Sequence, residues 1–210
     1  MKNILFTLGI AALSIIAFAF NQKSGGEEFE TIEIGTEAPL PDYQMVGIDG
    51  GERNLETLAS DNGLLVIFSC NTCPFVIAWE DRYPEIAQLA ASNGIGFALI
   101  NSNQAKRNGD DSMEEMMKHA NEKGYSNIPY LVDENSKLAN AFGAKTTPHV
   151  FLFDKEMRLV YEGAIDDNHK SKAEVKSSYL NDAILNLSEG KAIDPNNTKA
   201  LGCSIKRVKT

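Results

Sequence analysis

The chain has 210 residues, of which 43% are hydrophobic and 23% are charged. This length and composition suit one globular domain that buries its own hydrophobic core. The formal net charge is -9 at pH 7, and an acidic chain lacks the basic surface that binding to nucleic-acid phosphates requires. The three cysteines are too few for a disulfide-rich scaffold, so a close pair among them needs its own explanation.

The first residues have the layout of an export signal. Lys2 precedes an uncharged, apolar run over residues 4–20, and Ala17-Phe18-Ala19 offers small residues for cleavage. We therefore expect a signal peptide over residues 1–19, cleaved near Ala19, and a periplasmic or secreted protein. The alternative is an uncleaved helix that anchors the chain, because the run reaches the lower length limit for a membrane span. Export would place the cysteines where disulfides form and persist.

The rest of the chain divides into a polar linker over residues 20–35, one domain over 36–190 and a polar tail over 191–210. The domain begins with short β-type pieces and a hairpin-turn signal at Asp49-Gly50-Gly51. Asn54 is a candidate cap for a helical turn over 55–59. The apolar run over 64–68 predicts a buried strand, and the helical spacing over 76–91 predicts a helix kinked at Pro84.

Further strands are predicted over 95–100, 130–132, 150–153 and 159–161. Helices are predicted from Ser112 and from Asn135 or Ser136, and the pattern Ser171-Lys172-Ala173-Glu174 predicts a capped start for the last helix. The alternation of strands and helices indicates an α/β fold, with a central mixed sheet and helices on both faces. The loops after the parallel strands then meet at one edge of the sheet.

At such a strand-to-helix junction lies Cys70-Asn71-Thr72-Cys73-Pro74. Free backbone N–H groups at a helix N-terminus favour a thiolate. We expect a redox-active dithiol, with Cys70 as the nucleophile of lowered pKa and Cys73 as the thiol that resolves the mixed disulfide. This chemistry needs no cofactor and no metal. Its partners would be protein or small-molecule thiols and disulfides, and we expect a monomer. The plain alternative is a structural disulfide or two inert thiols.

The chain resembles the thioredoxin superfamily. Two segments carry the resemblance: Phe68-Ser69-Cys70-Asn71-Thr72-Cys73-Pro74, and Thr147-Pro148 leading into Phe151-Leu152-Phe153-Asp154. Gly35-Thr36-Glu37-Ala38-Pro39 is similar to the N-terminal extension of the redoxin or peroxiredoxin-like branch, the alkyl-hydroperoxide-reductase/thiol-specific-antioxidant group. The resemblance implies a thioredoxin-like fold and a cis proline, Pro148. It also implies that the Thr147-Pro148 backbone lies beside the cysteines and contacts substrate.

The chain also departs from these patterns. Ser69 stands where thioredoxins have a tryptophan, and alignment of Cys73 with the peroxidatic cysteine places Cys70 and Val66 where peroxidases have a threonine and a proline. We therefore favour a thiol–disulfide oxidoreductase over a peroxiredoxin-like peroxidase with antioxidant activity. A further alternative is a non-catalytic binding module, or a copper carrier that uses both cysteines and His149.

The sequence leaves several roles open for Cys203 in the tail. It could resolve a disulfide by closing on Cys70 or Cys73, it could be free or intermolecular, or it could be a packed structural residue. Other titratable groups are expected to be solvated: His119 faces water on its helix, and His169 lies in a loop. Surface positions are expected for the acidic residues, which include Asp110, Asp111, Asp166 and Asp167.

Overall fold

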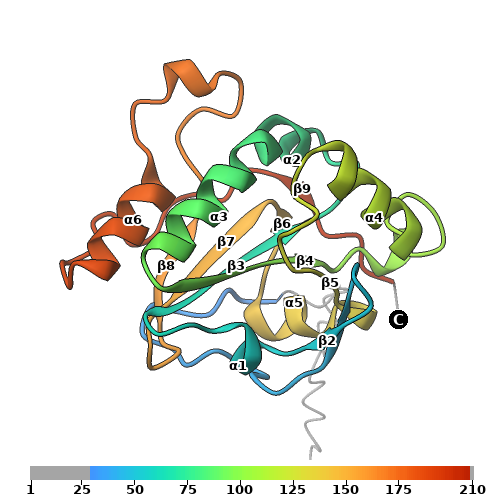
Figure 1. The fold of residues 1–210 in the computed structure, drawn as a ribbon, viewed down its shortest axis with the longest axis horizontal. Helices are drawn as coiled ribbons and strands as arrows, with labels where there is room; N and C mark the ends of the chain where they lie inside the picture. Colours follow the sequence, from blue (N-terminus) through green and yellow to red (C-terminus); the bar gives the residue numbers. More distant parts are fainter. Residues whose placement is uncertain (1–28, 209–210) are drawn as a thin grey trace, which may run out of the picture.

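A seven-stranded mixed sheet runs through the centre of the molecule, in the strand order β2-β1-β5-β4-β3-β7-β8 (Figure 1). The computed structural model describes residues 29–208. The strands are β1 Met45–Gly47, β2 Glu52–Arg53, β3 Gly63–Ser69, β4 Ile95–Asn101, β5 Tyr130–Val132, β7 His149–Phe153 and β8 Leu159–Gly163. Strands β3, β4 and β5 are parallel, and the outer strands are antiparallel to their neighbours.

Helices cover both faces of this sheet, as predicted (Figure 1). One face carries α2 Pro74–Trp79, α3 Tyr83–Ser92, α4 Met113–Glu122 and α6 Tyr179–Ser188. The other face carries the shorter α1 Leu55–Leu58 and α5 Lys137–Phe142. Strand β3 is buried along its whole length. Leu65 and Ile67 pack into the core on the face of α2, α3, α4 and α6, and Leu64, Val66 and Phe68 pack into the core on the face of α1 and α5. Burial on both faces explains its continuous apolar sequence.

The local start signals in the first half of the chain act as predicted. Asn54 Oδ1 accepts from the Thr57 N–H at 2.9 Å, and Thr57 Oγ1 accepts from the Asn54 N–H at 3.0 Å, which makes a capping box at α1. The predicted helix over 76–91 is divided into two before Pro84 and is not kinked at that residue. The 3₁₀ turn Glu80–Arg82 separates α2 from α3, and Pro84 lies in the first turn of α3, where it costs no helical hydrogen bond.

The predicted start of the last helix at Ser171 is wrong. Ser171 makes no side-chain cap, residues Lys172–Glu174 form only a 3₁₀ turn, and α6 begins at Tyr179. Loop side chains explain the difference: Asn168 Oδ1 accepts from the Ser171 N–H at 3.1 Å, and Asp167 Oδ1 accepts from the Lys176 N–H at 2.9 Å. These bonds satisfy the backbone groups of the segment without a helix.

Both flanks of the predicted domain lie against it. In the described part of the predicted linker, the Ile32 N–H donates to Phe142 O at 3.1 Å and the Gly35 N–H donates to Leu159 O at 2.7 Å. In the predicted tail, β9 Cys203–Ser204 pairs antiparallel with β6 Thr146–Thr147 as a second, two-stranded sheet. The expected signal peptide lies outside the described residues. Within residues 29–208, no helix is long and apolar enough to cross a membrane.

Candidate functional site

The two cysteines lie where β3 gives way to α2. Cys70 directly follows the strand, and Cys73 is the residue that precedes the first helical position, Pro74. Ser69 is buried at the strand end, and its hydroxyl lies 3.0 Å from the Tyr83 hydroxyl. The exposed fraction is 1% for Cys70 and 5% for Cys73. Both cysteines are therefore buried, and Cys73 is slightly less so than Cys70.

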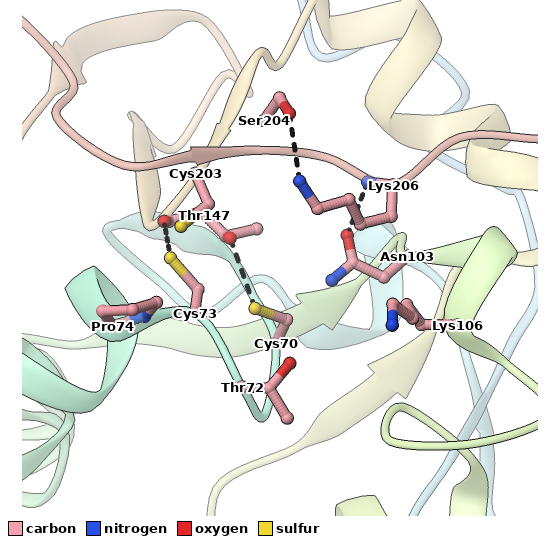
Figure 2. Close-up of a pocket in the computed structure, with 10 residues that line it drawn as sticks. All are labelled: Cys70, Thr72, Cys73, Pro74, Asn103, Lys106, Thr147, Cys203, Ser204 and Lys206. Atoms are coloured by element: carbon pink, nitrogen blue, oxygen red, sulfur yellow. Dashed lines mark hydrogen bonds between the residues drawn. The ribbon is translucent and has the colours of Figure 1, made fainter.

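Thr147 contacts both thiols from the opposite side (Figure 2). The Thr147-Pro148 peptide bond is cis. Cys73 Sγ lies 3.1 Å from the Thr147 carbonyl oxygen, and Cys70 Sγ lies 3.3 Å from Thr147 Oγ1. The carbonyl can only accept, so this contact favours a protonated Cys73, whereas the hydroxyl can donate to either form of Cys70.

Four donors favour the thiolate of Cys73. The Cys70 thiol has the largest effect, followed by the Cys203 thiol and the backbone N–H groups of Val76 and Cys203, and together they lower the pKa of Cys73 to about 4 against the effect of burial. The Thr147 carbonyl is the one contact that opposes them. Because the donors outnumber this acceptor, we assign the negative charge of the pair to Cys73.

Cys70 has the opposite surroundings. Its hydrogen bond to Cys73 raises the pKa of the Cys70 thiol, and burial and the negative charge of Asp111 raise it further, against the Thr147 hydroxyl and the Cys73 N–H, which lower it. The expectation that Cys70 has the lowered pKa is therefore wrong. The helix begins after Cys73 rather than at Cys70, so the first free N–H groups of α2 face the second sulfur of the pair.

The loop between the cysteines is held by a carboxylate that the sequence did not single out. Asp111 is fully buried, although it was expected at the surface. Asp111 Oδ1 accepts from the Asn71 N–H at 2.9 Å and from Asn101 Nδ2 at 2.8 Å, and Asp111 Oδ2 accepts from Asn103 Nδ2 at 3.0 Å. The available signal was the polar run Asn101-Ser102-Asn103, which begins at the last residue of the apolar strand β4, at the same sheet edge as the cysteines.

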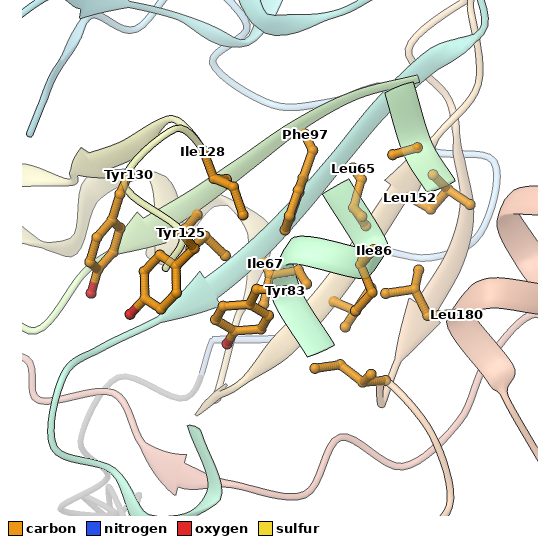
Figure 3. Packing of buried hydrophobic residues seen from close by; sticks show 14 of the residues in the cluster. Leu65, Ile67, Tyr83, Ile86, Phe97, Tyr125, Ile128, Tyr130, Leu152 and Leu180 are labelled. Carbon is orange, nitrogen blue, oxygen red and sulfur yellow. The ribbon is translucent and has the colours of Figure 1, made fainter. Parts of the chain in front are cut away.

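Three buried tyrosines, Tyr83, Tyr125 and Tyr130, pack in the core next to the site (Figure 3). The rings of Tyr83, Tyr125 and Tyr130 follow one another edge to face, with centroid distances of 5.6 and 6.3 Å. The two outer hydroxyls reach the site: that of Tyr83 pairs with Ser69, and that of Tyr130 donates to Asn71 Oδ1 at 3.0 Å. The polar ends of Tyr83 and Tyr130 therefore fix the strand end and the loop, while their rings pack in the core.

The C-terminal segment completes the site. Thr147 pairs with Cys203 between β6 and β9, and the Lys206 N–H donates to Asn103 Oδ1 at 2.8 Å. A cavity of about 210 Å³ opens between these elements. Its lining includes the three cysteines, Thr147 and two lysines, Lys106 and Lys206. Cys203, whose role the sequence left open, thus lies at the same site as the Cys70–Cys73 pair.

The histidines take no part in a metal site. The ring nitrogens of His149 are both engaged: Nε2 contacts Glu162 Oε1, and Nδ1 accepts from the Lys145 N–H at 3.2 Å. Residues 29–208 contain no cluster of three or more histidine, cysteine or acidic residues that could hold a metal ion. The copper site of Cys70, Cys73 and His149 is therefore not formed.

Three other groups expected to be solvated pack against neighbouring side chains: Asp166 is buried, and His119 and His169 are half-buried. Glu80 is buried, and its Oε2 lies 2.7 Å from His119 Nε2. Asp166 is buried, pairs with Arg82 at 2.8 Å and accepts from Trp79 Nε1 at 2.8 Å. His169 lies against Trp79, with ring centroids 5.5 Å apart. These contacts join the helix after Cys73 to neighbouring elements, and periodicity alone does not reveal them.

Solved structures show which proteins this chain is similar to. A hypothetical protein from Sinorhizobium meliloti 1021 is 31% identical over 86% of this chain and 98% of its own, with a TM-score of 0.78. An uncharacterized conserved protein from Geobacillus kaustophilus is 34% identical over 85% of this chain and 94% of its own, also with a TM-score of 0.78. Peroxidoxin BcpB from Mycobacterium tuberculosis shares the fold at 16% identity, covering 77% of this chain and 99% of its own, with a TM-score of 0.57.

No curated protein matched the chain. The sequence model of the Redoxin family matches residues 34–179, which is more than half of the chain and includes both Cys70 and Cys73. The fold and the position of the cysteine pair agree with this match. The chain therefore belongs to the redoxin family.

Proposed function

We propose that the protein is a thiol–disulfide oxidoreductase in which Cys73 is the attacking thiol and Cys70 is the resolving thiol. The observation that carries the proposal is the opposite environment of the two sulfurs. Cys73 is the more exposed and is surrounded by donors, whereas Cys70 is buried beside Asp111 and keeps its proton. A thiolate beside a protonated neighbour can attack a disulfide and then be released by that neighbour.

The exchange needs no group beyond the two thiols. The Cys73 thiolate attacks one sulfur of a partner disulfide, forms a mixed disulfide and expels the other partner sulfur as a thiolate. Cys70 then loses its proton to solvent or to the expelled thiolate and attacks the Cys73 sulfur, which releases the second partner thiolate. The partner gains two electrons and the Cys70–Cys73 pair loses two. The reverse sequence oxidises a partner dithiol.

Variants that keep a single cysteine test this assignment, because the chain has only three. The double variant Cys70→Ser/Cys203→Ser retains Cys73 and should form mixed disulfides with partner disulfides. The matched variant Cys73→Ser/Cys203→Ser retains Cys70 and should form few or none at neutral pH. Non-reducing electrophoresis with mass mapping of the adducts is the readout. Equal or preferential trapping through Cys70 would refute the assigned roles.

We also propose that the protein is exported, with residues 1–19 as a cleaved signal peptide. The support is the charged start, the apolar run and the small residues before the predicted cleavage site. Intact mass measurement of the protein expressed in its own cell type tests this. A chain that begins at Phe20 in the periplasm or the medium is expected, and a chain that retains residues 1–19 in the membrane fraction would support the anchored alternative.

Peroxide reduction is the second candidate, and one observation favours it. The thiolate belongs to Cys73, the position that aligns with the peroxidatic cysteine, and not to Cys70. In that reaction the Cys73 thiolate attacks one peroxide oxygen, the O–O bond breaks, and the other oxygen leaves as water or an alcohol after it takes up a proton. The sulfenic acid on Cys73 then reacts with the Cys70 thiol to form the disulfide and water. Thiol-dependent peroxide consumption that is lost in Cys73→Ser would support this candidate. Equal consumption by the variant would exclude it.

A further inference from the structure

We propose that Cys203 is a third redox residue of this site: it forms a disulfide with Cys73 in exchange for Cys70, and so links the buried pair to partners outside. The inference rests on the proposed dithiol exchange and adds a step to it. The proposal is carried by the position of the β9 segment, by the contacts of the Cys203 sulfur and by the exposure of the three thiols.

The β9 segment is fixed against the site from two sides. Cys203 pairs with Thr147, the residue that contacts both other sulfurs. Gly202 allows this approach, because a Cβ atom at its position would lie 2.3 Å from the Thr147 carbonyl oxygen. On the other side, Asn103 joins the segment to the loop of the pair, since it accepts from the Lys206 N–H and donates to Asp111. The same network therefore positions all three cysteines.

Cys203 and Cys73 are in direct contact. Cys203 packs against the buried cluster of Cys70, Cys73 and Val76, and its thiol and backbone N–H both lower the pKa of Cys73. Figure 2 shows the two sulfurs on the same side of the cavity, beside the Thr147 carbonyl oxygen. Cys73 therefore lies between two thiols, Cys70 in the interior and Cys203 toward the surface.

The exposure of the sulfurs gives Cys203 its role. Cys70 and Cys73 are buried, whereas Cys203 is only half-buried. Burial raises the pKa of Cys203, and contact with the charged Cys73 raises it further, while Lys206 lowers it. When Cys73 is in a disulfide it carries no charge, so this repulsion is removed at the stage at which Cys203 has to attack.

The added step conserves atoms and electrons. Starting from the Cys70–Cys73 disulfide, the Cys203 thiolate attacks the Cys73 sulfur, forms the Cys73–Cys203 disulfide and releases Cys70 as a thiolate, which takes up a proton. The protein as a whole stays oxidised by two electrons. A partner dithiol then attacks the half-buried Cys203 sulfur, releases the Cys73 thiolate, and closes its own disulfide as Cys203 leaves.

The test follows one mixed disulfide in two variants. Cys70→Ser and Cys70→Ser/Cys203→Ser are each treated with one equivalent of 5,5′-dithiobis(2-nitrobenzoate), and the adduct on Cys73 is followed by intact mass. In Cys70→Ser we expect loss of the adduct, release of nitrothiobenzoate and a Cys73–Cys203 linked peptide. In the double variant the adduct should persist at least ~100-fold longer, because a tethered thiol acts at an effective concentration in the millimolar range.

Each outcome decides one proposal. Equal lifetimes of the Cys73 adduct would overturn the role of Cys203 and leave the dithiol exchange intact. Failure of the double variant to form any adduct would instead count against Cys73 as the attacking thiol. If Cys70→Ser does not fold, oxidised wild-type protein is quenched in acid and mapped. A Cys73–Cys203 link beside Cys70–Cys73 then supports the proposal, and the Cys70–Cys73 link alone overturns it.

Discussion

Cys70 and Cys73 have the same side chain but different surroundings, and the difference arises from the last residues before α2. The strand ends at Ser69, two loop residues follow Cys70, and the helix starts only after Cys73. The free N–H groups and the neighbouring thiols therefore face Cys73, while the carboxylate of Asp111 acts on Cys70. The sequence motif predicts a dithiol, but the assignment of the charge depends on the residue at which the helix begins.

The first prediction concerns the hydrogen bond from Cys70 to Cys73. Alkylation of Cys73 by iodoacetamide should stay fast in the wild-type protein until the pH falls toward about 4, because only the thiolate reacts. Cys70→Ala removes the strongest donor. It should raise the midpoint by about one to two pH units, since a hydrogen bond to a charged group contributes ~1.5–3 kcal/mol. Cys70→Ser keeps a hydroxyl donor and should raise it less. An unchanged midpoint in Cys70→Ala would contradict the assigned hydrogen bond.

The second prediction concerns Asp111. Asp111→Ala leaves the Asn71 N–H and the amides of Asn101 and Asn103 without their buried acceptor. We expect a loss of about 2–3 kcal/mol in the free energy of unfolding, measured by urea denaturation. Removal of the charge should also lower the pKa of Cys70, because the charge of Asp111 contributes to its increase.

The neighbouring exposed carboxylate provides the matched control. Asp110 pairs with Lys106 at 3.5 Å on the surface, and such pairs contribute only ~0–1 kcal/mol. Asp110→Ala also keeps the backbone carbonyl that accepts from Asn71 Nδ2. If both variants unfold at the same urea concentration, Asp111 does not hold the loop as described.

At the scale of elements, the sequence predicts the parts whose signals are local or strictly periodic. The apolar run of β3, the Asn54 cap and the Pro74 position are of this kind, and each has its expected place. Local sequence patterns give a wrong prediction where hydrogen bonds from other residues determine the structure instead. Ser171 resembles a cap, but Asn168 and Asp167 bind the backbone of that segment first. Asp111 resembles a surface residue because its partners lie elsewhere in the chain: Asn71 in the loop between the cysteines, Asn101 at the end of β4, and Asn103 after it.

The β9 strand is the element that sequence analysis could not place. Its two residues have no periodicity, and its pairing with β6 depends on a glycine whose role appears only in three dimensions. The cis Thr147-Pro148 bond was inferred from resemblance and not from the residues, which gave it no local signal. The site could thus be predicted as a cysteine pair beside Pro148, with Cys203 as one open possibility and without its buried carboxylate.

The third prediction tests this pairing through Gly202. Gly202→Ala brings a methyl group within 2.3 Å of the Thr147 carbonyl oxygen, and the strand must move to relieve the contact. We expect a destabilisation of about 1–3 kcal/mol and faster alkylation of Cys203, because its contact with Cys73 is weakened. Gly109→Ala is the control, since the nearest atom there lies 3.9 Å away. Equal alkylation rates of Cys203 in the two variants would show that β9 does not depend on the close approach of Gly202.

At the scale of the whole molecule, three parts of the chain meet at the cysteine pair: the parallel strands, the segment with the cis proline, and the C-terminal segment. The parallel strands β3 and β4 bring Cys70 and the Asn101–Asn103 run to one edge, β7 brings the cis proline opposite, and the C-terminal segment crosses over the cavity. The functional unit therefore extends beyond the predicted domain over 36–190 to at least Lys206. The α/β class and the mixed sheet followed from the order of strands and helices, because that order leaves few possible topologies.

The reduction potential of the mature protein tests the central claim most directly. Wild-type protein is equilibrated in glutathione buffers of graded potential, quenched in acid and mapped for disulfides. The account predicts a reversible two-electron transition that involves Cys73, at a potential between about −120 and −270 mV, the range of catalytic dithiols. A disulfide that is reduced only below about −300 mV would indicate a structural bond. That result, or the absence of any disulfide to Cys73, would contradict dithiol exchange as the function of this site.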